Sequence, residues 1–197
     1  NPESDSTGRL VVEAADALGV PLTPEIAEPV FAAVATDTGW FRFASTTSET
    51  YRLAARLVEA GARPDLLFKQ LYEDDSFARL QLIGRTLGRA QTELDGRLIY
   101  SWLELTDFDS TGAVASDSED LINMLLTVGG TEVAVIFVEQ RSGGFKISFR
   151  SRSDVDCTHL AEQFHGGGHK RAAGALVKEP LERAKAVVLD AVRAAMR

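Results

Sequence analysis

The chain has 197 residues, enough for one medium domain or two small ones, and its 45% apolar and 25% charged residues are ordinary for a globular protein. A formal net charge of −8 argues against a general nucleic-acid coat protein, because such proteins are normally basic. The longest apolar runs, such as Val133 to Val138, are far shorter than the ~20 residues of a membrane-spanning helix, so we expect no membrane partner.

The first part of the chain predicts helices. Apolar periodicity, N-cap residues and first-turn prolines predict them over residues 10–18, 23–36, 46–61, 64–71 and 76–91. Pro29 lies inside the second helix and should bend it, because proline lacks the backbone N–H. Asp95-Gly96 is a turn signal that ends the run of helices. We therefore expect a helical part over residues 1–94 and a second domain over residues 95–197.

Asp37 lies where the second predicted helix ends, within Thr36-Asp37-Thr38-Gly39. An aspartate between an apolar helix and a glycine is commonly a cap or turn residue, and that is its structural interpretation. Trp40, Phe41 and Phe43 follow directly. They are candidates for a base-stacking platform, but we favour a role in the core or in an interface.

Residues 95–197 alternate strands with helices. The pattern predicts strands over residues 98–105, 131–139 and 145–150, a polar loop over 107–118, and helices over 119–127, 154–164 and the segment after Pro180. The strand over 131–139 is almost continuously apolar and should be central and buried. Ser142-Gly143-Gly144 is a hairpin turn, so the next strand should be its antiparallel neighbour.

The strand over residues 145–150 alternates strictly between apolar and polar positions. Phe145, Ile147 and Phe149 share one face, whereas Lys146, Ser148 and Arg150 share the other. Arg150 is therefore directed away from the core. Its side chain is either part of a solvated basic face or a bidentate ligand for a phosphate group.

A glycine-rich stretch follows the helix predicted over 154–164. Gly166, Gly167 and Gly168 allow left-handed conformations and close approach of a ligand, and successive N–H groups of such a loop can form a nest for an oxyanion. His169-Lys170-Arg171 adds positive charge and hydrogen-bond donors beside this backbone. We interpret the stretch as a phosphate-binding loop, with a purely structural hairpin as the alternative. The small residues 172–175 then lead into a strand that runs away from the site.

The region around this loop is basic although the protein is acidic. From Arg141 to Arg171 there are six Lys or Arg against three acids, and all three histidines lie between residues 159 and 169. Such a local patch fits a small anionic ligand better than a long duplex. His169 is the histidine we expect to contact the ligand.

Cys157 is the single cysteine, which excludes an intramolecular disulfide and fits a reducing cytoplasm. Its helical spacing with Leu160, Ala161 and Phe164 favours packing over nucleophilic catalysis. The first five residues are polar rather than basic and then apolar, so we expect no secretory signal.

Two motifs resemble one known family. Phe164 to Gly174 (Phe-His-Gly-Gly-Gly-His-Lys-Arg-Ala-Ala-Gly) closely resembles the signature of the DHH-associated domain, the C-terminal module of DHH-family phosphoesterases, except that many members carry a glycine in place of His165. Thr36 to Phe43 (Thr-Asp-Thr-Gly-Trp-Phe-Arg-Phe) resembles the last motif of the DHH catalytic domain. The two stand in the family's order, and the chain is most similar to the nanoRNases, some of which also dephosphorylate 3'-phosphoadenosine 5'-phosphate.

The resemblance implies roles for particular residues. Asp37 would be a catalytic residue, as one carboxylate of a two-metal centre that holds Mn²⁺. The family's other metal ligands, among them its Asp-His-His, have no counterpart in residues 1–36. The implied substrate-binding residues are Ser148, Arg150, Gly166, Gly167, Gly168, His169 and Lys170.

The resemblance also implies a fold and a function. We expect an α/β protein, with a partial DHH catalytic lobe that is mostly helical in residues 1–94 and a small mixed-sheet DHH-associated domain in residues 95–197. The whole protein would be a cytoplasmic, metal-dependent phosphoesterase acting on short single-stranded oligonucleotides or nucleotide phosphates, and residues 1–197 alone would be inactive. The alternatives are a non-catalytic nucleotide or cyclic-dinucleotide binding module and the editing-associated part of an alanyl-tRNA synthetase. The oligomeric state, a homodimer included, stays open.

Overall fold

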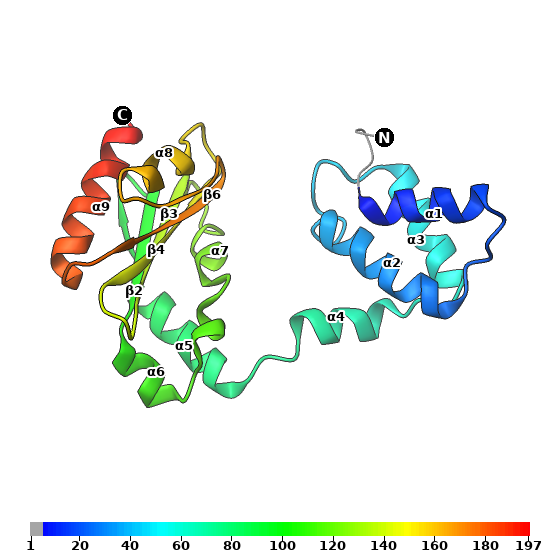
Figure 1. The fold of residues 1–197 in the computed structure, drawn as a ribbon, viewed down its shortest axis with the longest axis horizontal. Coiled ribbons are helices and arrows are strands. Elements are labelled where there is room, and N and C mark those ends of the chain that lie inside the picture. The colour runs from blue at the N-terminus through cyan, green and yellow to red at the C-terminus, as the bar shows by residue number, and fades with distance from the viewer. Residues whose placement is uncertain (1–5) are drawn as a thin grey trace. The chain divides into compact units, whose positions relative to one another are not determined.

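The computed structural model describes residues 6–197 (Figure 1). The expectation about a secretory signal concerns residues 1–5 and lies outside that range. The chain divides into two units, one ending at Asp74 and the other running from Asp75 to Arg197. Each unit has its own apolar core. Among residues 6–197, no helix is both long enough and apolar enough to span a bilayer.

The described part of the first unit is helical and contains no strand, in agreement with the sequence. Its helices are α1 (Thr7–Ala17), α2 (Pro24–Asp37), α3 (Ser48–Glu59) and α4 (Pro64–Tyr72). Their apolar faces meet in a core that includes Val12, Ala27, Phe31, Val34 and Leu57.

The starts of these helices differ in detail from the predictions. Helix α1 begins earlier because the Ser6 hydroxyl accepts a hydrogen bond from the Arg9 N–H at 3.2 Å. Thr23 precedes α2 but makes no capping bond to the backbone; its hydroxyl instead hydrogen-bonds the Glu25 carboxyl and lowers the pKa of that group. The capping box of α3 joins Thr47 to Thr50.

The second unit is built on one mixed sheet with strand order β1-β2-β3-β4-β6-β5. Strands β2 and β3 are parallel and all other neighbours are antiparallel. The central position of β3 and its hairpin with β4 were both predicted, and the predicted α/β class is confirmed. The strands are β1 (Gln91–Glu93), β2 (Leu98–Leu103), β3 (Val133–Glu139), β4 (Phe145–Ser151), β5 (Gly167–His169) and β6 (Ala172–Val177).

Helices cover the two faces of this sheet unequally (Figure 1). One face packs against α8 (Cys157–Glu162) and α9 (Leu181–Ala195), and its core includes Phe137, Ile147 and Phe149. On the other face α5 (Phe77–Gly88), α6 (Leu105–Thr111) and α7 (Leu121–Leu125) pack over β2 and β3, around Ile99, Ala134 and Ile136. On that second face the residues of β6 and β5 stay exposed or half-buried.

Three features of the second unit differ from the sequence-based expectations. The prediction of a polar loop over residues 107–118 is wrong, because this segment contains most of α6 and the 3₁₀ helix η1 (Ala115–Ser118). Asp107 starts α6 by accepting the Glu104 N–H at 2.8 Å, and its carboxylate is also paired with Arg89. Strand β1 was not predicted. Helix α5, expected in the helical part, packs on the second unit, so this compact unit begins at Asp75.

Candidate functional site

Strand β4 presents Ser148 and Arg150 away from the main core, as its alternation predicts. Phe145, Ile147 and Phe149 are at most 5% exposed, whereas Lys146 is exposed and Ser148 and Arg150 are half-buried. Because hydrophobic burial fixes which face of a strand turns inward, the polar set has no alternative orientation.

The pairing of β4, β6 and β5 brings most of the predicted binding residues onto one face. Arg150 pairs with Ala172 and Ala172 pairs with His169; Ser148 pairs with Gly174 and Gly174 pairs with Gly167. Directly opposed residues of neighbouring strands share a face, so each trio forms a row across three strands. Arg150 and His169 are two strand spacings apart, about 10 Å. We call this surface the open face, defined by Ser148, Arg150, Gly167, His169 and Gly174.

Two of the three glycines, Gly167 and Gly168, lie in a strand rather than in a loop. Gly167 to His169 form the edge strand β5, and among Gly166, Gly167 and Gly168 only Gly168 has a positive φ, of 150°. Successive N–H groups of a strand point in opposite directions, so the predicted nest of neighbouring amides is wrong. What the strand offers a ligand is instead a flat surface without side chains beside His169.

The three glycines differ in what an added side chain would meet. A Cβ on Gly166 would overlap the Gly174 carbonyl, and one on Gly168 would lie 2.5 Å from the Ala173 Cα. A Cβ on Gly167 would meet no atom within 4 Å. Packing therefore requires glycine at 166 and 168 but leaves Gly167 unconstrained. His165 adopts a φ of 58°, in the left-handed region that favours glycine, so a glycine at that position would be relaxed.

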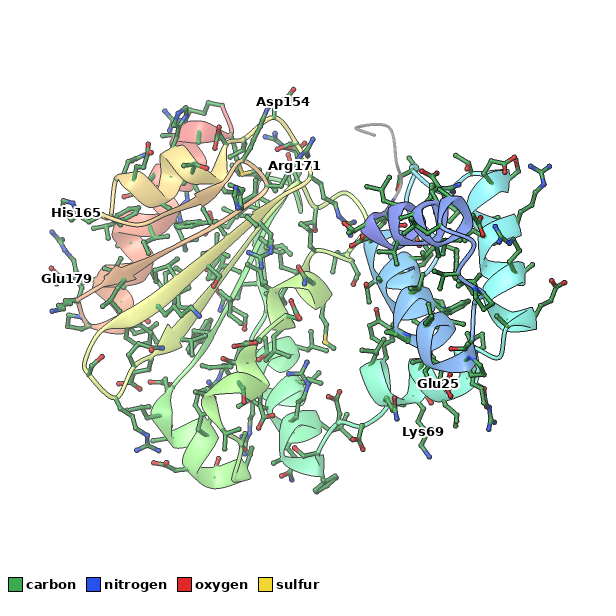
Figure 2. The ribbon with its side chains drawn as sticks, turned by 45° about the vertical axis from the view of Figure 1, so that its right-hand side comes forward. Glu25, Lys69, Asp154, His165, Arg171 and Glu179 are labelled. Atoms are coloured by element: carbon green, nitrogen blue, oxygen red, sulfur yellow. The ribbon has the colours of Figure 1, made fainter. Side chains whose placement is uncertain are left out.

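The turn after β5 is anchored through Lys170 and Arg171. The Lys170 carbonyl accepts the Cys157 N–H at 2.9 Å, and the Arg171 carbonyl accepts the Ser151 N–H at 3.1 Å. The Arg171 guanidinium donates to the Ser153 carbonyl at 3.1 Å, beside the loop that carries Asp154 (Figure 2). Arg171 therefore has a structural contact, whereas the Lys170 side chain is exposed and forms no ion pair with the described residues.

A hollow of about 220 Å³ lies against β4, and we call it the small hollow. Lys146, Ser148 and Arg150 form one side of it, and residues 118–120 are among those on the other. The Arg150 guanidinium donates to the Phe149 carbonyl at 3.1 Å, and its other N–H groups have no acceptor among the described residues. Lys146 was not among the predicted binding residues, although the alternation of β4 already placed it on this face.

Asp37 is the exposed last residue of α2, and its carboxylate accepts the Thr7 N–H at 3.2 Å. The buried Thr38 donates to the Val34 carbonyl at 2.7 Å and accepts the Phe41 N–H at 3.2 Å, so it anchors the turn that follows. Trp40 and Phe41 have φ angles of 57° and 64°, which are strained for such bulky residues. Sequence reasoning did not identify this role of Thr38.

The aromatic residues after Asp37 belong mainly to the core. Trp40 makes edge contacts with Phe68 and Tyr72, and Phe41 stacks on Tyr51. The packing interpretation of Trp40 and Phe41 is thus confirmed, whereas Phe43 is 56% exposed.

Within residues 6–197, no three His, Cys, Asp or Glu side chains are grouped so that they could hold a metal ion. Asp37 alone does not make the two-metal centre that the family resemblance implies. Cys157 is buried, and burial raises the pKa of its thiol to about 11 despite the nearby Arg150. A thiol with that pKa is protonated at neutral pH. The burial of Cys157 in the core with Leu160 and Ala161 confirms its predicted packing role.

The chain is similar to one domain family and to proteins named for two hydrolytic activities. The DHHA1 domain family matches residues 95–197. The bifunctional oligoribonuclease and PAP phosphatase NrnA of Thermus thermophilus is 37% identical over 195 residues, covering 98% of this chain and 58% of the relative. The Bacillus subtilis protein of the same name is 30% identical over 159 residues, covering 81% of this chain and 50% of the relative.

The fold of the chain is also similar to that of a solved structure. The crystal structure of an exopolyphosphatase-related protein from Bacteroides fragilis superposes with a TM-score of 0.89 at 28% identity, covering 98% of this chain and 57% of that one. The chain therefore spans between 50% and 58% of the length of these relatives.

Proposed function

This chain belongs to the DHHA1 domain family of the DHH phosphoesterases, and from that premise we propose that it supplies the substrate-binding part of a hydrolase acting on short oligonucleotides. We propose short single-stranded oligonucleotides and 3'-phosphoadenosine 5'-phosphate as the substrates of the whole protein, because the two NrnA relatives are named for those activities. Neither relative is a tRNA synthetase or a non-catalytic binding module.

The open face carries this proposal, with Arg150 as its central residue. The free N–H groups of Arg150 would donate charge-assisted hydrogen bonds to a phosphate, and the Ser148 hydroxyl would add another. Gly167 would let the ligand approach the backbone, because neither packing nor its φ angle explains a glycine there. His169 and Lys170 would bind a second phosphate or a sugar edge from the other side of the open face, with Gly166 and Gly168 shaping the strand.

DHH phosphoesterases are metal-dependent, and we propose Mn²⁺ as the ion, with Asp37 as one of its ligands. When bound, such an ion would activate water for attack on the phosphorus atom. Asp37 does not suffice to hold it, so the residues described here account for binding of the substrate and not for its cleavage. We also propose a cytoplasmic location, which fits the single buried Cys157.

Titration of the 197-residue chain with the 5'-phosphorylated diadenylate pApA tests this proposal. Binding should be measurable by calorimetry, should weaken with added salt, and should fall in Arg150→Ala. Arg183→Ala is the matched control, because Arg183 is an exposed arginine on α9, the helix that packs on the opposite face of the sheet. Equal affinity in the two variants would reject the open face as the binding site.

A further inference from the structure

A second, larger hollow adjoins the small hollow and has no role in the function proposed so far. It has a volume of about 580 Å³ and lies between α6, η1 and the β3–β4 hairpin, and we call it the large hollow. The two hollows share four lining residues: Ser118, Glu119, Val138 and Lys146. A continuous groove therefore leads from Arg150 along β4, past Lys146, into the large hollow.

The lining of the large hollow suits an apolar ring rather than a phosphate. Its wall includes Leu105, Phe108, Val114 and Val138, and its volume lies within the range of small-molecule sites. Two carboxylates, Glu119 and Glu139, border it. A phosphate here would face these negative charges.

The basic groups near the large hollow also disfavour a phosphate inside it. Arg141 is paired with Asp109 at 3.0 Å, so its charge is already compensated. Lys146 lies at the junction of the two hollows and has no ion-pair partner among the described residues. Positive charge that is available for a phosphate therefore ends where the apolar wall begins.

From this arrangement we infer that the large hollow binds a nucleobase of a substrate whose two phosphates lie at Arg150 and at Lys146, so that the groove reads two neighbouring nucleotides. The inference rests on the proposed function. Lys146 and Arg150 are four residues apart on one strand, about 13 Å. A ligand larger than a mononucleotide is needed to occupy that length and the hollow beyond it. The large hollow would thus favour a dinucleotide over a nucleoside monophosphate.

The wall formed by residues 114–119 is held in place before any ligand arrives. Arg79 of α5 donates to the carbonyls of Asp117 and Glu119, at 2.8 and 3.3 Å. The Asp117 carboxylate accepts the Val114 N–H at 2.8 Å. A preformed wall loses little conformational entropy on binding, which favours affinity.

Val114→Trp tests the inference, because Val114 lines the large hollow and is 60% exposed. An indole there would fill the space meant for the base. Affinity for pApA should fall roughly tenfold, at the low end of the loss of a base contact, whereas affinity for AMP should stay within about twofold. Val128→Trp is the control, since Val128 is an exposed valine that lines neither hollow.

The outcomes separate this inference from the proposed function. Unchanged pApA affinity in Val114→Trp would overturn the base site while leaving Arg150→Ala to test the open face. Absence of AMP and pApA binding by the parent chain would instead reject the proposed function.

A second test measures nuclear Overhauser effects in the parent chain, so its result does not depend on how the variant folds. Contacts between adenine protons of bound pApA and the Val114 methyl groups support the site, and their absence in a saturated complex overturns it.

Discussion

Gly167→Ala distinguishes a glycine strand that binds a ligand from one that only connects elements. A Cβ at Gly167 would meet nothing within 4 Å, and the residue does not have a positive φ. Alanine therefore fits without strain and restricts the unfolded chain. The free energy of unfolding should stay unchanged or rise by up to about 1 kcal/mol.

Gly168→Ala is the matched comparison one residue away. Its φ of 150° and the distance of 2.5 Å between the added Cβ and the Ala173 Cα require the backbone to move. We expect a loss of stability of about 1–3 kcal/mol, as for other strained backbone positions. Urea unfolding followed by circular dichroism measures both variants.

The binding assay then decides between the two interpretations. If a phosphate lies against β5, the methyl group of Gly167→Ala blocks its approach, at a cost comparable to the loss of one charge-assisted hydrogen bond, about 1.5–3 kcal/mol. The Kd for pApA should then rise at least about tenfold in calorimetry, although the variant is as stable as the parent. An unchanged Kd in Gly167→Ala would refute the role of β5 in binding.

Three further predictions concern other parts of the site. Arg150→Ala should lose about 1.5–3 kcal/mol of pApA binding free energy. Its Tm should change little, because the Arg150 side chain donates its observed hydrogen bond only to the carbonyl of the neighbouring Phe149. A large drop in Tm would show that Arg150 is structural. Since burial raises the pKa of Cys157 from 9.0 to about 11, the folded chain keeps a proton that the unfolded chain releases. The free energy of unfolding should therefore decline between those pH values more steeply in the parent than in Cys157→Ala, and parallel urea-unfolding curves would contradict this. With Asp37 as the one metal ligand proposed, the 197-residue chain should show no appreciable Mn²⁺-dependent hydrolysis of pApA, a result that EDTA-sensitive turnover would contradict.

The open face could be predicted in part, because its main strand has a strong local pattern. The alternation in β4 placed Ser148 and Arg150 opposite the apolar residues without any tertiary information. The glycine motif drew attention to the right segment for binding but did not predict that it pairs as a strand. Gly167 to His169 have no strand propensity of their own, and their conformation depends on pairing with Ala172 to Gly174.

Other parts depend on contacts between distant residues, which a local pattern does not contain. Helix α6 looks like a polar loop in sequence, but Asp107 both caps it and pairs with Arg89 of the segment after α5. The row that joins Arg150 to His169 follows from the register of two strand pairs. The groove between the two hollows depends on the placement of η1, which Arg79 holds from α5.

An NMR titration of the ¹⁵N-labelled 197-residue chain with pApA tests the central claim, that the open face binds a short oligonucleotide. We predict that the largest amide shift changes on saturation occur at Ser148, Arg150, Gly167 and His169. The hollow between residues 153–156 and the end of α9 is an internal control on the same unit. Saturable changes confined to that hollow, with the amides of the open face unaffected, would contradict the account.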